Sequence, residues 1–367
     1  MRRGLAILLA AVAALAAGCG LRSGGDDATT SPGSAVPMRP APAPLQIANG
    51  PVEAADPGQP PLRLKLRGAS DPVRLRFHDQ PRSGLLFDLD TGEVLWRRLP
   101  DRVLPIASLT KMMTALIVVQ RERPADKVKV TKEALAYKGS GVGVLPRGKR
   151  IKLETMLNGL LLPSGNDAAI ALAQRVSGTV EGFVTRMNEQ SRALGLSCTH
   201  FTSPSGFVDQ GNHSCATDLA GLARAVLDEP RLARIVKRRR AVLPFPIKGG
   251  RIYLFNNNPL LRTGYPGTIG VKTGFTNAAG RCLVAAAQRG GRRLGVVLLH
   301  SPDPGRQAQV LLDRGFKVGR SRCPERGRPV LGRPRPVDTT QRCPAGTAAS
   351  SGVAGRSCTP GSPASTS

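Results

Sequence analysis

Two apolar runs near the C-terminal end of the 367-residue chain constrain its fold most strongly. Residues 282–287 (CLVAAA) and 294–299 (LGVVLL) have the composition of β-strands, and Gly290 and Gly291 stand between them. A glycine pair is favoured in a tight hairpin turn, because it adopts positive φ at no steric cost. The pattern therefore predicts a β-hairpin from residue 282 to residue 299.

Strand-like and helical patterns alternate in a fixed order before and after this hairpin. Residues 84–88 and 93–97 flank turn residues and predict a second hairpin far upstream. Between the two hairpins, from about 123 to 240, the apolar spacing is largely helical. The separate predictions are helices at 155–162, 167–176, 180–194, 216–227 and 304–316, and strands at 241–243, 251–254 and 268–274. A sheet built from both ends of a domain, with helices between, is an α+β arrangement.

The first 19 residues resemble an export signal. Basic residues precede an apolar run over 5–17, and small residues follow. Cys19 comes after Ala-Ala-Gly, which resembles the lipobox of bacterial lipoproteins, although Leu15 lies one residue further back than that motif usually has it. Residues 14–16 also form an ordinary A-x-A cleavage site. A lipid anchor at Cys19 and a plainly secreted protein both remain open.

Composition divides the rest of the chain. Residues 20–82 are rich in proline, glycine and serine and predict a disordered tether. Residues 83–319 predict the folded domain, with a helical subdomain at about 123–240. Residues 320–367 are again rich in arginine, proline and glycine and predict a disordered basic tail.

The formal net charge of +28 bears on partners and location. Only 4% of residues are aromatic and the arginines are scattered, so we exclude a nucleic-acid partner for this exported chain. Long-range attraction favours an anionic bacterial cell envelope as the partner.

Six cysteines follow the signal, and none forms a C-x-x-C pair or a cysteine–histidine cluster of metal spacing. We expect Cys198 and Cys215 to form a disulfide outside the cytoplasm, since a short loop around Pro204 can bring them together. The pairing of the other cysteines stays open.

A serine and a lysine three residues apart form the first candidate chemical site. Apolar residues recur at helical spacing from Leu109 to Val119, and Pro105 stands where a first helical turn favours proline, so a helix is predicted to start near Ser108. On a helix the amine of Lys111 can reach the hydroxyl of Ser108. Apolar neighbours would lower the lysine pKa, which makes a base beside a nucleophile.

Two further motifs accompany this pair. Ser164 and Asn166 form the only Ser-x-Asn in the chain, on a predicted loop between helices, where an N-cap is the alternative interpretation. Residues 272–274 (Lys-Thr-Gly) end a predicted strand, where a lysine and a hydroxyl can bind a carboxylate. The similar Arg-Thr-Gly at 262–264 lies between prolines and predicts a turn.

In this order the three motifs resemble D-alanyl-D-alanine carboxypeptidases, the low-molecular-mass penicillin-binding proteins of the S11 serine peptidase family. Residues 107–115, 160–169, 201–206 and 270–276 are also similar to runs of that family, and the resemblance covers about 83–319. It implies a serine β-lactamase and DD-peptidase-like fold, with an antiparallel sheet, helices on both faces and a mostly helical subdomain. It also implies that peptidoglycan stem peptides are the substrate, that β-lactam antibiotics are covalent inhibitors, and that no cofactor or metal is needed.

The resemblance further implies a role for each matching residue. Ser108 is the expected nucleophile and Lys111 its base, while Ser164 and Lys272 pass a proton to the leaving amine. The expected substrate-binding residues are Asn166, Lys272, Thr273, Gly274 and Phe275. The backbone N–H groups of Ser108 and Phe275 form the expected oxyanion hole.

Two alternatives remain. A class A β-lactamase needs a Glu-x-x-Leu-Asn run downstream of the serine loop, whereas residues 154–158 (ETMLN) precede it. A protein that binds penicillin or the cell wall without catalysis is the second alternative.

Overall fold

The computed structural model describes residues 64, 66, 70–207 and 210–318. The predicted export signal with Cys19, most of the tether and the basic tail lie outside the described residues. In the part that is described, no helix has the length and apolar character needed to cross a bilayer.

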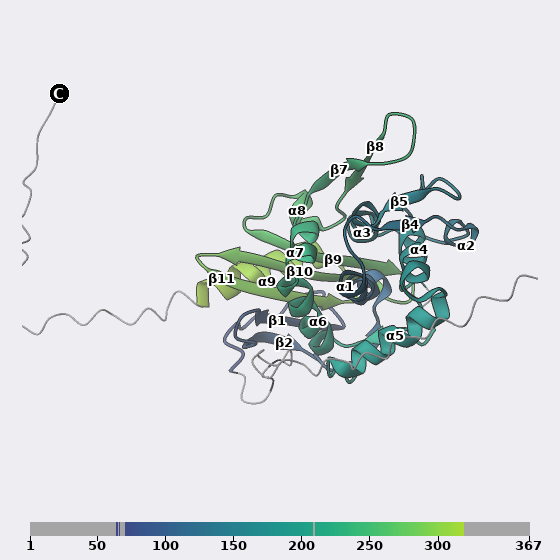
Figure 1. Cartoon of the computed structure of the whole chain (residues 1–367). Helices are drawn as coiled ribbons and strands as arrows, with labels where there is room; N and C mark the ends of the chain where they lie inside the picture. The colour runs from purple at the N-terminus through teal and green to yellow at the C-terminus, as the bar shows by residue number, and fades with distance from the viewer. Residues whose placement is uncertain (1–63, 65, 67–69, 208–209, 319–367) are drawn as a thin grey trace, which may run out of the picture. The chain divides into compact units, whose positions relative to one another are not determined.

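A five-stranded antiparallel sheet joins the two ends of the domain, in the order β2-β1-β11-β10-β9 (Figure 1). Its strands are β1 (Ser83–Asp88), β2 (Val94–Arg98), β9 (Thr268–Thr276), β10 (Gly280–Arg289) and β11 (Arg292–Leu299). The N-terminal strand β1 pairs directly with the C-terminal strand β11. This arrangement confirms the α+β class expected from strands at both ends of the sequence.

The β10–β11 turn shows why its sequence was predictive. Gly290 and Gly291 have φ values of 54° and 79°, which only glycine adopts without strain. Residues 282–287 and 294–299 pair across this turn as predicted.

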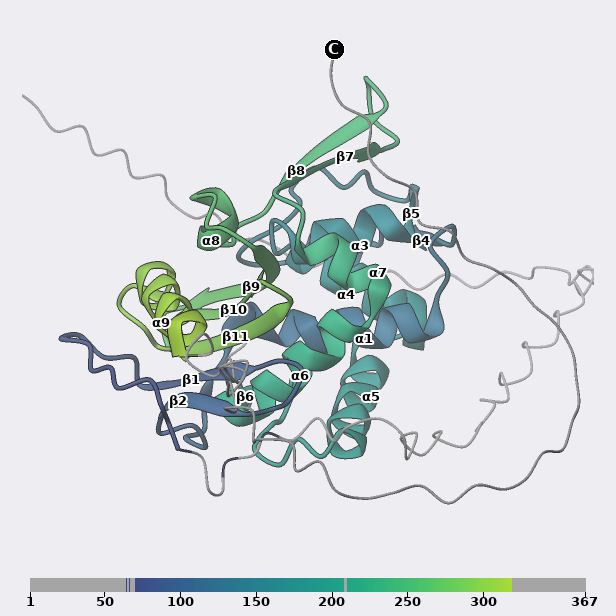
Figure 2. The ribbon, with the colours of Figure 1, turned by 90° about the vertical axis from the view of Figure 1, so that its left-hand side faces the viewer.

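Helices cover both faces of the sheet, as Figure 2 shows. Successive residues of β1 point to opposite faces, so Leu86 packs in the core beneath α9 (Pro304–Val318), whereas Leu85 and Phe87 pack in the core that holds α1 (Lys111–Arg121) and α6 (Ala216–Asp228). Both cores are built from buried apolar side chains. The sheet is therefore fixed from both sides, which gives β9 a rigid support.

The predicted helical subdomain contains α3 (Leu153–Leu161), α4 (Asn166–Ser177), α5 (Val180–Ala193), α6 and α7 (Pro230–Val236). The helices predicted at 155–162, 167–176, 180–194 and 216–227 are confirmed with small shifts at their ends. The subdomain also holds the one-turn helix α2 (Lys132–Leu135) and two short strands, β4 (Lys127–Lys129) and β5 (Arg150–Lys152), which alternate exposed and buried residues. The strand pair predicted at 241–243 and 251–254 is the separate hairpin of β7 (Arg240–Pro244) and β8 (Arg251–Phe255).

The helix predicted to start near Ser108 begins slightly later. Residues Ala107–Thr110 form a 3₁₀ turn, η1, and α1 follows from Lys111. Pro105 was expected in the first helical turn and instead lies in β3 (Leu104–Pro105), which pairs with β6 (His213–Ser214). The positive φ of 48° at Ala107 keeps Pro105 out of the helix, because a regular right-handed helix cannot contain such a residue.

Residues 70–82 precede the domain boundary expected at residue 83. The backbone N–H of Val73 donates to the carbonyl oxygen of Leu95, and the indole of Trp96 donates to the carbonyl oxygen of Leu75. Val73 is buried. The structure thus places the last part of the expected tether against β2.

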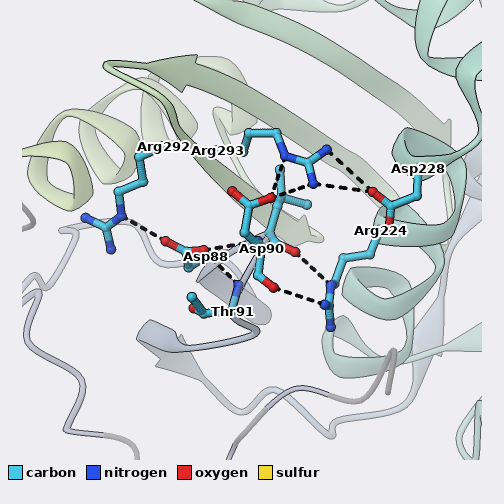
Figure 3. A network of polar contacts seen from close by, with 8 residues as sticks. Asp88, Asp90, Thr91, Arg224, Asp228, Arg292 and Arg293 are labelled. Atoms are coloured by element: carbon cyan, nitrogen blue, oxygen red, sulfur yellow. Dashed lines mark hydrogen bonds and ion pairs between the residues drawn. The ribbon is translucent and has the colours of Figure 1, made fainter. Parts of the chain in front are cut away.

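Charged residues connect the two sheet hairpins to α6 (Figure 3). Arg292 pairs with Asp88, and Arg293 bridges Asp90 and Asp228. Burial alone raises the pKa of Asp88. The hydrogen bond from Arg292 and the backbone N–H groups of Thr91 and Asp90 outweigh it, so the pKa lies below the ordinary value of 3.8.

Candidate active site

Ser108 and Lys111 meet at the junction of η1 and α1. The amine Nζ of Lys111 lies 2.8 Å from Oγ of Ser108. Lys111 is fully buried, while Ser108 is partly exposed and lines a cavity of about 460 Å³. A hydroxyl open to the cavity and an amine shielded from solvent are thus in direct contact.

Lys111 makes two further contacts that fix the direction of its amine. Nζ lies 2.7 Å from Oδ1 of Asn166 and 2.7 Å from the carbonyl oxygen of Ser205. Both of those oxygens can only accept. A neutral amine that donates its two hydrogens to them has its lone pair left for the Ser108 hydroxyl. This geometry suits proton transfer from Ser108 to Lys111.

Burial holds the pKa of Lys111 well below its ordinary value of 10.5, and the positive charge of Lys272 lowers it further. The carboxylate of Asp167 acts in the opposite direction and raises it. Because burial dominates, the neutral amine becomes accessible far below pH 10.5.

Ser164, which lines the same cavity, forms a second serine–lysine contact with Lys272. Nζ of Lys272 donates to Oγ of Ser164 at 2.9 Å and to the carbonyl oxygen of Thr273 at 2.8 Å. Burial lowers the pKa of Lys272 to about 7. Both protonation states of this lysine are therefore populated near neutral pH.

The N-cap interpretation of residues 164–166 is wrong. The N-cap of α4 is Gly165, and neither neighbouring side chain caps the helix. Ser164 has a positive φ of 69° and contacts Lys272, while Asn166 donates to the carbonyl oxygen of Lys138 and accepts from Lys111. Both side chains are directed to the lysines.

Strand β9 brings the Lys-Thr-Gly motif beside η1. A Cβ atom added to Gly274 would lie 2.9 Å from the carbonyl oxygen of Ile106 and 3.1 Å from the backbone nitrogen of Ser108. Only glycine permits this approach. Thr273, Gly274 and Phe275 line the same cavity as Ser108, so the structure brings all three motifs together.

The loop around Ser205 supports η1, and its role was missed from the sequence. Asn212 donates to Oγ1 of Thr110, which donates to the carbonyl oxygen of Ala107. Gly206 has a φ of 71°, and a Cβ atom there would lie 2.0 Å from the oxygen of Ala107. The Ser-Gly pair at 205–206, a combination typical of turns, is the sequence feature that could have indicated this loop.

Cys198 and Cys215 are joined by a disulfide, with their Cα atoms 5.8 Å apart. The 17-residue separation encloses the loop around Ser205, so the bond restrains a segment that contacts Lys111. Among the described residues, Asp218 and these two sulfurs are the one cluster with metal-site spacing, but disulfide sulfurs are not thiolate ligands.

A loop at 138–143 also belongs to the site and carried no sequence signal. The backbone N–H of Asn166 donates to the carbonyl oxygen of Ser140, which lines the cavity. The carboxylate of Asp167 accepts from the backbone N–H groups of Val142 and Gly143. These contacts hold Asn166 in position for Lys111.

Arg262 and Arg281 also line the cavity and were not predicted as site residues. The turn predicted at 262–264 is in part the one-turn helix α8 (Pro259–Arg262), followed by Gly264 at a φ of 68°.

The glutamate of the β-lactamase alternative is engaged elsewhere. Glu154 lies in the first turn of α3, and its carboxylate accepts from Nε of Arg231 at 2.8 Å. Asn158 accepts from Arg238. Neither residue lines the cavity that contains Ser108.

A family model described as D-alanyl-D-alanine carboxypeptidase, Peptidase_S11, matches residues 76–303. D-alanyl-D-alanine carboxypeptidase DacF of Bacillus subtilis (strain 168) is 35% identical over 245 residues, 65% of this chain and 62% of DacF. DacB2 of Mycobacterium tuberculosis, with the same description, is 37% identical over 242 residues, 64% of this chain and 81% of DacB2. This chain therefore spans about three fifths of the length of DacF.

Solved structures agree. A mutant of Streptomyces K15 DD-transpeptidase matches with a TM-score of 0.62 at 31% identity, covering 66% of this chain and 100% of that one. A D-alanyl-D-alanine carboxypeptidase from Mycobacterium tuberculosis H37Rv matches with a TM-score of 0.61 at 34% identity, covering 66% of this chain and 94% of that one. With the three motifs around one cavity, these matches show that the chain belongs to the S11 family of D-alanyl-D-alanine carboxypeptidases.

Proposed function

We propose that the protein is a serine-type D-Ala-D-Ala carboxypeptidase that removes the terminal D-alanine from peptidoglycan stem peptides. The observation that carries this proposal is the hydrogen-bonded set at one cavity, in which Lys111 contacts Ser108 and Asn166 while Lys272 contacts Ser164. The family match supports the choice of substrate.

Acylation uses the first serine–lysine pair. Lys111 accepts the proton of the Ser108 hydroxyl as its oxygen attacks the carbonyl carbon between the two D-alanines. The developing oxyanion receives hydrogen bonds from the backbone N–H groups of Ser108 and Phe275. The close approach of Gly274 to the nitrogen of Ser108 supports this placement.

The second pair serves the leaving group. As the C–N bond breaks, Lys272 and Ser164 deliver a proton to the amine of D-alanine, and an ester remains on Ser108. Thr273 binds the terminal carboxylate and Asn166 the substrate amide. Water then hydrolyses the ester, releasing the shortened peptide and restoring the Ser108 hydroxyl.

β-Lactam antibiotics fit the same chemistry, because their ring amide acylates Ser108 and the acyl group stays covalently attached. The engagement of Glu154 with Arg231 argues against the β-lactamase alternative, since that carboxylate does not reach the ester. The protein acts in the cell envelope, either secreted or anchored by a lipid at Cys19.

Intact-mass analysis with and without a penicillin, together with D-alanine release from a peptide ending in D-Ala-D-Ala, tests the proposal. We expect one covalent adduct and D-alanine release, both lost in Ser108→Ala. Ser177→Ala, at the far end of α4 from Asn166, is the control and should keep both signals. The mature mass also reports lipid attachment and the cleavage site.

An adduct in Ser108→Ala would place the nucleophile elsewhere. An adduct without D-alanine release would favour the non-catalytic alternative, and rapid turnover of penicillin would favour a β-lactamase.

A further inference from the structure

The β7–β8 hairpin carries an outer face that is largely open to solvent in the described part of the chain. Cross-strand pairing places Arg240 opposite Phe255, Val242 opposite Tyr253 and Pro244 opposite Arg251 on one face. We call these six residues, with Ile247 and Lys248 in the turn, the hairpin face. Figures 1 and 2 show the hairpin projecting away from α3 and α8.

Large apolar side chains on this face are open to solvent. Tyr253 is 64% exposed, Phe255 62%, Val242 43% and Ile247 37%. The opposite face of the same hairpin is buried, with Ile252 and Leu254 in the main core. The fold therefore buries the inner face and leaves the aromatic side chains of the outer face mostly exposed.

The cations of this face are also without partners. Arg240, Lys248 and Arg251 are exposed, and none makes an ion pair within the described ranges. Residues 237–258 contain six basic residues and no aspartate or glutamate. The hairpin face is thus both aromatic and cationic.

We propose that the hairpin face docks onto an anionic phospholipid bilayer. Tyrosine and phenylalanine side chains partition into the boundary between headgroups and acyl chains, and nearby lysine and arginine attract anionic headgroups. A soluble anionic polymer would use the cations but leave the apolar side chains in water. A second copy of this chain would oppose cations to cations across a symmetric interface.

The hairpin face lies close to the cavity along the chain. Strand β8 ends at Phe255, and Asn257, Pro259 and Arg262 line the cavity that contains Ser108. Only Asn256 separates the end of β8 from the first of these cavity residues, so docking through the hairpin would tether the domain that contains the cavity to the bilayer.

Site-specific fluorescence in the full-length protein tests this proposal. The chain has one tryptophan, Trp96, which is 5% exposed, so Tyr253→Trp adds a reporter at the hairpin face. Vesicles of phosphatidylglycerol carrying brominated acyl chains should quench and blue-shift this reporter, and phosphatidylcholine vesicles should not. Lys129→Trp on the β4–β5 hairpin, exposed among basic residues, is the matched control and should show neither change.

Charge and apolar contributions are then separated. Replacing Arg240, Lys248 and Arg251 by glutamine should lower the vesicle partition coefficient of the hairpin reporter on the order of 100-fold. Removing three charges from Lys127, Lys129 and Lys152 should change it much less. Phe255→Ser should reduce quenching while leaving the charge unchanged.

Equal quenching at both reporters would indicate nonspecific adhesion and overturn the proposal. So would the absence of quenching, binding to a soluble phosphate polymer without binding to vesicles, or self-association that Phe255→Ser abolishes. The measurement does not depend on catalysis, so its failure would leave the proposed hydrolysis untouched.

Discussion

The free energy of unfolding should depend on pH partly through the titration of Lys272. Replacing Lys272 by methionine is expected to remove that contribution. The lysine is 1% exposed, and burial lowers its pKa from 10.5 to about 7. Between these pH values the unfolded chain keeps the proton and the folded chain releases it, so folding becomes more stable as pH rises through this window. Stability is lost as pH falls from 10.5 towards 7 and then stays level.

The magnitude follows from the linkage slope, which is about 1.4 kcal/mol per pH unit for one proton. From pH 7.5 to 9.5, Lys272 should therefore contribute about 2.7 kcal/mol of increasing stability, and Lys272→Met should lack that contribution. Lys111 is present in both proteins, so its own contribution largely cancels in the comparison. The slope is a cleaner measure than stability at one pH, because methionine also loses the contacts with Ser164 and Thr273.

Urea unfolding at several pH values between 7.5 and 9.5, at constant ionic strength and without reductant, gives both slopes. Lys129→Met removes one exposed positive charge and serves as the control. Equal slopes in the wild type and in Lys272→Met would refute the reasoning, since they would mean that Lys272 keeps its proton in the folded protein.

Three further predictions concern the site and its support. Asn166→Asp should place a carboxylate 2.7 Å from Nζ of Lys111 and raise the lysine pKa by about 1–3 units, so acylation by penicillin should slow about 10- to 1000-fold near neutral pH and recover as pH rises. Asp88→Asn should lower the free energy of unfolding by about 1–3 kcal/mol in urea titrations. The pKa of Asp88 is lowered in the folded protein, so the difference in unfolding free energy between the wild type and the variant should be largest above about pH 4. It should vanish as pH falls through the folded pKa. Replacing Cys198 and Cys215 by serine should lower the free energy of unfolding by about 3 kcal/mol through loop entropy, measured without reductant.

Local patterns carried most of the fold prediction. The β10–β11 hairpin could be predicted because its glycine pair allows the positive φ values of the turn and its apolar runs lie directly on either side. The Ser108–Lys111 contact was predicted for the same reason, because three residues along a helical turn set its distance. Contacts between distant motifs followed only from the family resemblance, since no local pattern places Lys272 beside Ser164.

The features that the sequence did not reveal are mostly made by the backbone. The oxygens that hold Lys111 and Asn166 are carbonyls of Ser205 and Lys138, and any residue type can supply a carbonyl. Likewise the positive φ of Ala107, which a regular right-handed helix cannot contain, leaves no mark on the residue type. Sequence patterns indicate where side chains lie, whereas this site depends on side chains and on backbone groups.

The amide at residue 166 favours the neutral form of Lys111 although an acidic residue lies next to that amide in the chain. Asp167 adjoins Asn166, and its charge acts to raise the pKa of Lys111. Its oxygens accept from the backbone N–H groups of Val142 and Gly143, so the carboxylate is directed at the loop and Asn166 faces the lysine. Lys111 thus meets oxygens that accept hydrogen bonds without carrying full negative charge. Burial can then lower the pKa of Lys111, which an ion pair would raise. The buried amine lowers the stability of the fold, and the proposed mechanism uses it as the base for Ser108.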